Sequence, residues 1–546
     1  MKLSDLIARA AEEALWMPDL RDAFAALPGS CLLVLRLVCM DGAIEERELM
    51  IPRWETAEEK RFVREFLWAS VYNLLSVCSG RALWFFVPPE EALTEALREL
   101  PEVFQLGKEK RSGYGKVTAI ADRLCRAFGL PPFAFHIAPM ESYRPEERDT
   151  APVTDTLAST LRAREQDADR LTLCGVDIGG TDIKLALSVE GKLVCTGEYD
   201  WNPAASPTAE EIITPILEQV RALRLEAMRR LSLPEPPLLD AIGVSFPDIV
   251  MDNRILGGET PKTAGIRANP AVSYDREFEK LSGLKELLLL QCRPGAVVRM
   301  LNDGNMAAFT AAMELACSSE DAPLRDGLIA HTLGTDLGSG WLLPDGSVPP
   351  FSLELYDLIL DLGNRRAAAF PPEDLRSTRN ENSGLAGTRR YLGQSAAFRL
   401  AQELDPGLLD GFTVREGNAL TVQTRPEDLR KPCLEHLMQL AGGENPAAET
   451  VFRRIGLHFA VLSREAEFLL HTVSRERYLY GRFVKSPRCF SLLCEGCAAR
   501  MPQLRLVAAD EDLAASSLMK QLTGMRGITV AQFGQAVGAL YYAVPA

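Results

Sequence analysis

The segment LTLCGVDIGGTDIKLALSVEGKLVCTGEYD (residues 171–200) contains the pentapeptide Asp177-Ile178-Gly179-Gly180-Thr181. The apolar run before Asp177 predicts a buried strand, the two glycines predict a tight turn, and two further strands follow around a turn at residues 190–191. Glycine has no Cβ, so the backbone N–H groups of such a turn can approach a phosphate, and a carboxylate beside it can hold a metal ion. Taken alone, the segment is equally compatible with a hairpin whose turn is capped by Asp177.

Two later segments repeat this combination of strand ends, glycines and acids. MLNDGNMAA (residues 300–308) places Asp303 between a predicted strand and a predicted helix, where an open α/β site carries a general base. The alternative is that Asn302 or Asp303 only caps the helix. LGTDLGSG (residues 333–340) lies between two predicted strands and is a second candidate phosphate cradle, although glycine-rich hairpins are common.

In this order and spacing, the segments resemble the motifs of the ROK family of sugar kinases, within the actin-like ATPase superfamily. DIGGTDIK resembles the family's first phosphate motif, and LGTDLGSGWLLPDG resembles its second phosphate motif. AIGVSFPDIV, followed by Gly257 and Gly258, resembles the segment that contacts the sugar. LNDGNMAA resembles the catalytic segment. The resemblance covers about residues 171–360. It implies an α/β fold with two lobes, of the actin-like ATPase (RNase H-like) type, and we expect an additional, mainly helical N-terminal domain.

The resemblance also implies an activity, which is ATP-dependent phosphorylation of a sugar hydroxyl with Mg²⁺-bound nucleotide in a cleft between the lobes. Asp303 would be the catalytic base. The residues implied to contact the sugar are Asn302, Gly257, Gly258, Glu354 and Asp357. The residues implied to bind the nucleotide are Asp177, Gly179, Gly180, Thr181, Lys184, Gly334, Thr335, Gly338 and Gly481, with Asp177 positioning Mg²⁺.

The sequence departs from the family pattern at several places. Asp357 stands where the family has a histidine, and no cysteine occurs between Cys317 and Cys433, so we predict no zinc. Asp336 stands where the second phosphate motif usually has glycine, and Gly481 is what remains of the adenosine motif. A catalytically weak pseudokinase or a sugar-binding regulator of the same family is therefore the alternative function.

Residues 378–402 occupy the region after the missing zinc loop. Arg389, Arg390 and Gln394 in this segment could reach an anionic or unusual substrate, and a solvated helix face is the alternative.

The predicted domain organisation has four parts. Residues 1–137 form a mainly helical domain, with two segments around 31–40 and 82–87 that could be strands, and residues 138–170 form a linker with a short helix. Residues 171–305 form lobe one. Residues 306–546 form lobe two, whose C-terminal helix returns to lobe one.

Composition limits the partners. The 546 residues carry a net charge of −15, and residues 1–170 contain 22 Lys+Arg and 28 Asp+Glu, a net charge of −6, which disfavours nucleic-acid binding. The N-terminus does not resemble a signal peptide and no apolar run has the length of a bilayer, so we expect a cytoplasmic chain without membrane contact. The partners that we expect are a small-molecule sugar and a second copy in a homodimer.

Overall fold

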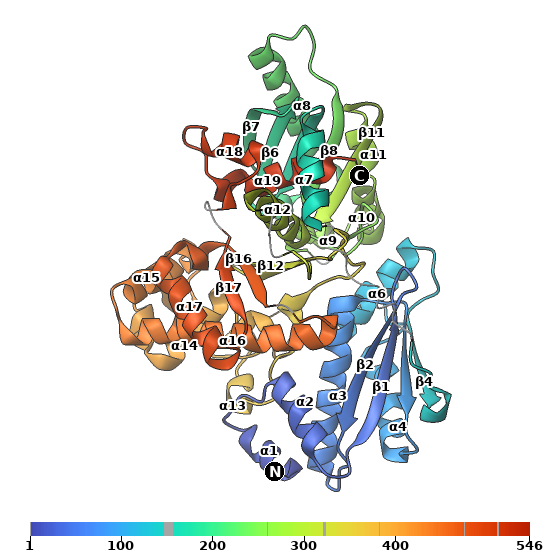
Figure 1. Ribbon diagram of the computed structural model, residues 1–546. Helices are drawn as coiled ribbons and strands as arrows, with labels where there is room; N and C mark the ends of the chain where they lie inside the picture. The colour runs from blue at the N-terminus through green and yellow to red at the C-terminus, as the bar shows by residue number, and fades with distance from the viewer. Residues whose placement is uncertain are drawn as a thin grey trace.

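The computed structural model describes residues 2–146, 157–258, 260–319, 324–381, 383–473, 475–509 and 513–545. Figure 1 shows three regions: lobe one at the top of the view, lobe two below it, and an N-terminal region, in blue, beside lobe two.

Lobe one is built on a five-stranded sheet with the order β11-β8-β5-β6-β7. Its strands are β5 (Thr172–Ile178), β6 (Asp182–Val189), β7 (Lys192–Asp200), β8 (Leu239–Phe246) and β11 (Cys292–Asn302). Strands β5, β6 and β7 are antiparallel neighbours, whereas β8 lies parallel to β5 and β11 parallel to β8. The strands predicted in residues 171–200 are therefore present.

Alternate residues of β5 face two different helices because successive side chains point to opposite faces of a sheet. Cys174, Val176 and Ile178 share a core with α8 (Glu210–Leu231). On the other face, Leu173 belongs to the core of α19 (Val530–Ala543). The C-terminal helix thus returns to lobe one, as the sequence predicts.

Lobe two repeats the same strand plan with one strand fewer. Its sheet has the order β13-β12-β16-β17, with β12 (Leu328–Leu333), β13 (Leu337–Leu342), β16 (Glu476–Tyr480) and β17 (Arg505–Ala508). As in β5–β6, the first two strands form an antiparallel hairpin, and β16 and β17 follow as parallel strands. Two related α/β lobes are the fold class that the sequence predicts, and this prediction is confirmed.

Helix α12 (Asp303–Ser318) joins the lobes. It begins directly after β11 of lobe one, packs on β12 and β13 of lobe two, and contacts α19. Its residues and those of α19 share one apolar core between the two sheets.

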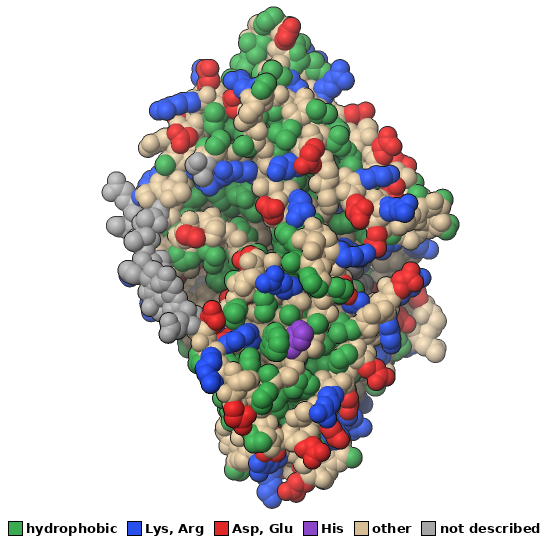
Figure 2. Space-filling view, turned by 90° about the vertical axis from the view of Figure 1, so that its right-hand side faces the viewer, with side chains coloured by type: hydrophobic (Ala, Val, Ile, Leu, Met, Phe, Trp, Pro, Cys, Tyr) green, Lys and Arg blue, Asp and Glu red, His purple; other side chains and the backbone are tan. Residues whose placement is uncertain are grey.

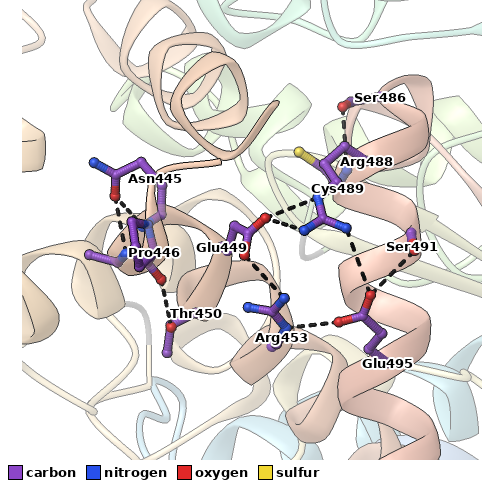
Figure 3. A network of polar contacts seen from close by, with 12 residues as sticks. Asn445, Pro446, Glu449, Thr450, Arg453, Ser486, Arg488, Cys489, Ser491 and Glu495 are labelled. Carbon is purple, nitrogen blue, oxygen red and sulfur yellow. Dashed lines mark hydrogen bonds and ion pairs between the residues drawn. The ribbon is translucent and has the colours of Figure 1, made fainter. Parts of the chain in front are cut away.

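Lobe two also carries the helices α14 (Gln394–Leu404), α15 (Arg430–Gly442), α16 (Pro446–Leu470) and α17 (Pro487–Arg500). Figure 3 shows the polar network that joins the start of α16 to α17. Glu449 accepts hydrogen bonds from Arg453 and Arg488, and Arg453 also pairs with Glu495 at 2.8 Å. The Asn445 side chain caps α16 by accepting from the backbone N–H groups of residues 447 and 448.

The N-terminal region has more helical than strand residues, as expected, and its helices accompany a four-stranded sheet. Its strands are β1 (Cys31–Val38), β2 (Ile44–Ile51), β3 (Ala82–Val87) and β4 (Ala134–Pro139), in the order β2-β1-β3-β4. Its longer helices are α2 (Met17–Ala26), α3 (Ala57–Cys78), α4 (Glu91–Arg98) and α6 (Gly115–Ala127), and α1 (Leu3–Arg9) precedes them. The strands expected around 31–40 and 82–87 correspond to β1 and β3. Strand β2 was not predicted, because charged residues in its sequence IEERELMI interrupt the alternation of apolar and polar residues that indicates a strand.

The N-terminal region and lobe two share one hydrophobic core. Asn73 of α3 donates to the backbone oxygen of Ile359 at 2.9 Å and to the carboxylate of Glu465 on α16 at 3.0 Å. The backbone N–H of Leu353 donates to the oxygen of Val77 at 2.9 Å. The region is therefore not a separate body with its own core.

The predicted linker at residues 138–170 contains the end of β4 and helix α7 (Leu157–Ala168), which packs on α12. Residues 147–156 of this linker lie outside the described residues.

The surface has no single sign of charge in the view of Figure 2, where Lys and Arg side chains are interspersed with Asp and Glu over one side of the molecule. Among the described residues, none of the helices combines the length and the apolarity that a membrane span requires.

Candidate functional site

Asp303 is placed by the junction between β11 and α12. Asn302 is the N-cap of α12, and its side-chain oxygen accepts a hydrogen bond from the N–H of Gly304 at 2.9 Å. The Asn302 amide in turn donates to the backbone oxygen of Asp248 at 2.9 Å. Burial raises the pKa of Asp303, which the charge of Lys262 partly opposes. The cap is thus supplied by Asn302, and the Asp303 carboxyl group has the raised pKa of a general base.

A cavity of about 530 Å³ lies between the two lobes at this junction; we call it the sugar-side cavity. Its volume is within the range of about 300–1,000 Å³ found for small-molecule sites. Lobe one contributes Gly180, Asp248, Lys262, Asn302 and Asp303 to its lining. Lobe two contributes Gly334, Thr335, Asp336, Gly338, Glu354, Tyr356, Arg389 and Gly481. Both glycine-rich turns therefore face the same cavity as Asp303.

A second cavity, of about 390 Å³, adjoins the first; we call it the nucleotide-side cavity. The two share Thr332, Gly334, Thr335 and Gly481 in their linings. The second cavity also has Asp177 and Lys184, the cations Arg482 and Lys485, and the apolar side chains Leu434, Val484, Leu513, Met519 and Val530. The second phosphate turn is therefore the boundary between the cavities.

Asp177 lies at the end of β5, beside the first turn. Burial raises the pKa of its carboxyl group to about 6, against a hydrogen bond from Ser245 and the charge of Lys184. The Lys184 ammonium pairs with Asp182 and lies 3.8 Å from Glu198. A buried carboxylate of this kind fits Mg²⁺, which takes one or two carboxylates and completes its shell with water and substrate phosphates. In the part of the chain that the structure describes, no group of three or more His, Cys, Asp or Glu is arranged to hold a metal ion.

Glu354 and Asp357 have different surroundings. Glu354 lines the sugar-side cavity, and burial together with the charge of Asp357 raises its pKa to about 8. Asp357 lies behind that lining, where it pairs with Lys116 of the N-terminal region and accepts from the Asn380 amide at 3.2 Å. The structure thus places Glu354 at the cavity and Asp357 one layer behind it.

Five of the residues predicted for the site line neither cavity: Gly179, Thr181, Gly257, Gly258 and Asp357. The N–H of Gly179 donates to the oxygen of Asp182 at 2.8 Å and closes the first turn. The N–H of Gly258 donates to the Asp248 carboxylate at 2.8 Å, and a Cβ on Gly257 would lie 2.1 Å from that carboxylate. These two glycines therefore hold Asp248, and Asp248 is the residue of that segment that reaches the cavity.

Asp248 and Lys262 are cavity residues that the sequence interpretation missed. Asp248 belongs to the segment AIGVSFPDIV (residues 241–250), but the family resemblance implied sugar contacts only for Gly257 and Gly258, which follow that segment. Lys262 lies in the short helix Pro261–Thr263 and belongs to none of the motifs. Only the position of Lys262 near Asp303 and Gly180 in the structure identifies it as a residue of the site.

The Asp336 carboxylate on the second phosphate turn is paired. Arg389 lies 2.6 Å from it and packs over the Tyr356 ring, 5.0 Å from the ring centroid. Of the residues suggested for unusual substrates, Arg389 lines the sugar-side cavity and Gln394 the nucleotide-side cavity. Arg390 is buried and donates to the backbone oxygen of Arg379 at 2.9 Å. Arg389 therefore offsets the negative charge that Asp336 brings to the turn.

Gly304, the residue after Asp303, and Gly340 of β13 lie very close together, which brings Asp303 near the second phosphate turn. A Cβ on Gly340 of β13 would lie 1.9 Å from the backbone oxygen of Gly304, the residue after Asp303. Only a residue without a side chain allows the first turn of α12 to sit this near the β12–β13 hairpin.

Comparisons with known proteins gave matches only among solved structures. No protein-family model matches the chain, and no curated protein matches it. A ROK family glucokinase from Streptomyces griseus, in complex with glucose and AMPPNP, is 18% identical, covers 68% of this chain and 99% of its own, and has a TM-score of 0.40. The ROK hexokinase from Thermus thermophilus is 15% identical, with 68% and 98% covered and a TM-score of 0.41.

A ROK family transcriptional regulator, a homologue of the E. coli MLC protein, also matches. It is 12% identical, with 82% of this chain and 99% of that chain covered and a TM-score of 0.39. These structures come from the family that the sequence motifs resemble, and at these TM-scores the likeness carries no further conclusion.

Proposed function

We propose that this chain phosphorylates a sugar hydroxyl with ATP and Mg²⁺. One observation carries the proposal: Asp303, with its raised pKa, lines the same cavity as both glycine-rich turns, one from each lobe. Phosphoryl transfer requires an acceptor and a donor phosphate held in line, with charge neutralisation around them, and little covalent chemistry from the protein.

The sugar is proposed to bind in the sugar-side cavity. Asp303 takes the proton from the attacking hydroxyl, and its raised pKa improves it as a base near neutral pH. Asn302 and Glu354 are hydrogen-bonding groups for the other hydroxyls. Lys262 holds positive charge beside Asp303 and favours its deprotonated form before the proton moves.

The nucleotide is proposed to lie in the nucleotide-side cavity. Its phosphates would reach the shared boundary at Gly334, Thr335 and Gly481, and its base would contact the apolar side chains of that cavity. Asp177 is the residue that would hold Mg²⁺, which when bound neutralises phosphate charge. Arg482 and Lys485 supply further positive charge to the same cavity.

The test is a coupled ADP-release assay with ATP and Mg²⁺ over a panel of hexoses, aminosugars and polyols, with Asp303→Asn as the control. Turnover with at least one sugar, lost in the variant, supports the proposal. A sugar that binds to wild type without any ADP release overturns it and favours the pseudokinase or sugar-binding regulator.

The pseudokinase alternative rests on Asp336, because a carboxylate on a phosphate turn opposes binding of a polyanion. The ion pair with Arg389 reduces that opposition, and for this reason we place the kinase first.

A further inference from the structure

Helix α6 (Gly115–Ala127) of the N-terminal region contacts both lobes. Figure 1 shows it where the N-terminal region meets lobe one. Its start carries Lys116 toward lobe two, and its later turns carry Arg123 toward lobe one. Each of these contacts lies directly behind one wall of the sugar-side cavity.

On the lobe-two side, Lys116 forms an ion pair with Asp357, and both side chains are largely buried, with 15% and 4% of their surfaces exposed. The Lys116 ammonium also lies 5.7 Å from the centroid of the Tyr356 ring. Tyr356 and Glu354, which lie one and three residues before Asp357, line the cavity. A charge from the N-terminal region therefore fixes the short helix Leu355–Asp357 that carries this wall.

On the lobe-one side, the Arg123 guanidinium donates to the backbone oxygen of Gly257. The next residue, Gly258, donates its N–H to the Asp248 carboxylate, and the Asp248 oxygen accepts from Asn302. Asp248 and Asn302 both line the cavity. Three hydrogen bonds therefore connect Arg123 to Asn302, the residue that precedes the proposed base.

Apolar packing holds the middle of α6 on lobe one. Ile120, Leu124 and Cys125 share a small buried cluster with Ile249, Met251 and Leu256, the residues between Asp248 and Gly257. At the helix end, Arg254 donates to the backbone oxygen of Ala127 at 3.1 Å. The helix is therefore held along its length, and a displacement of the helix would displace the residues of both cavity walls.

We infer that Lys116 and Arg123 are positioning residues, and that α6 sets the separation of the two walls of the sugar-side cavity. The N-terminal region is then part of the sugar-binding unit. This inference rests on the proposed function for its ligand, a sugar, but the wall contacts stand without it. Removing the charge of Lys116 leaves a buried carboxylate at Asp357 without its ammonium partner, which forces the wall to rearrange.

The test uses the full chain with Lys116→Met, Arg123→Met and the control Arg126→Met. Arg126 lies on the same helix but forms only an exposed pair with Asp275 at 3.4 Å. Hydrogen–deuterium exchange read by mass spectrometry is expected to rise at residues 352–358 in Lys116→Met and at residues 247–258 in Arg123→Met. The control should raise neither. Unchanged exchange at both walls in both variants would overturn the inference, whatever the activity.

Steady-state kinetics with the sugar that wild type turns over give the second measurement. KM for the sugar should rise about 10- to 100-fold, the size of effect of a small misplacement, while kcat stays within about 3-fold. Lys116→Arg should recover most of the loss, since it restores the charge. A fall in kcat with unchanged KM, or no recovery in Lys116→Arg, would contradict a positioning role. If wild type phosphorylates no sugar, the proposed function fails, and the exchange result still decides the inference.

Discussion

Asn302 is the N-cap of α12, and Asp303 beside it is the proposed base. The N–H of Gly304 donates to both side chains, at 2.9 Å to Asn302 and at 2.8 Å to Asp303. An asparagine at position 303 keeps an oxygen for this hydrogen bond and removes only the carboxylate. We therefore expect Asp303→Asn to lower turnover by about 10²–10⁴-fold, as for loss of a positioned base, with little change in sugar binding. The melting temperature should stay the same because the cap is intact. Steady-state kinetics and a thermal melt check this, and near-wild-type turnover would remove Asp303 from the mechanism.

Glu354 gives a pH dependence of stability. Its pKa is raised to about 8 in the folded protein, from an ordinary value of 4.5. Between these values the unfolded chain loses the proton first, so ionisation favours unfolding and the contribution of Glu354 to stability falls as pH rises from about 4.5 to 8. Urea unfolding at pH 5, 6, 7 and 8 should show the stability of wild type falling relative to Glu354→Gln across this window. A constant difference would show that Glu354 is not buried in its neutral form.

Arg389 and Asp336 form the pair that keeps the second phosphate turn close to neutral. Arg389→Ala leaves the carboxylate unpaired beside the proposed phosphates, so we expect KM for ATP to rise about 10-fold, equivalent to one to two kcal/mol of binding. The double variant Asp336→Gly, Arg389→Ala should recover most of this loss. A loss that persists in the double variant would mean that Arg389 contacts the substrate itself.

The two glycines at the junction of α12 and β13 make an element-scale prediction. Gly340→Ala would place a Cβ 1.9 Å from the Gly304 oxygen, so the helix and hairpin must move apart. We expect the free energy of unfolding to fall by about 1–3 kcal/mol, the usual cost of overpacking. Gly442→Ala near the end of α15 is the control, since nothing lies within 4 Å of its added Cβ and alanine favours a helix. Chemical denaturation compares the two, and equal effects would show that the close approach is not a constraint.

The elements that the sequence predicts well are those whose signal is local. The strands and turn of residues 171–200 and the junction at Asp303 follow from apolar runs broken by glycine and acid. Strand β2 was missed because its charges mask the alternation. The partner of Asp336 could not be predicted either, since Arg389 lies 53 positions away and no local pattern connects them.

At the scale of the whole molecule, the contact between the N-terminal region and lobe two is what the sequence could least reveal. Asn73 forms hydrogen bonds with two residues that lie 286 and 392 positions later in the chain. The amino-acid composition of the two regions does not reveal that they share a hydrophobic core. The polar segment near residue 140 suggested a boundary between two domains. A polar segment can, however, connect two regions that still pack against each other.

This shared core makes a prediction for the isolated C-terminal part. Residues 140–546 expressed alone should be insoluble or lack near-UV circular dichroism, because the face of lobe two that α3 covers is then exposed to water. The full chain is the control. A soluble fragment with a cooperative melt would show that lobe two does not need the N-terminal region.

Helix α19 covers one face of the lobe-one sheet, and this has a consequence for the order of events during synthesis on the ribosome. The last strand of that sheet ends at Asn302, but the covering helix begins at Val530, about 230 residues later. At a synthesis rate of about 5–20 residues per second, one apolar face of the sheet stays uncovered for about 10–45 s. The nascent chain is a natural client for a chaperone during this interval. A stop codon between residues 303 and 529 would release a lobe whose sheet is complete but lacks the helix that covers it.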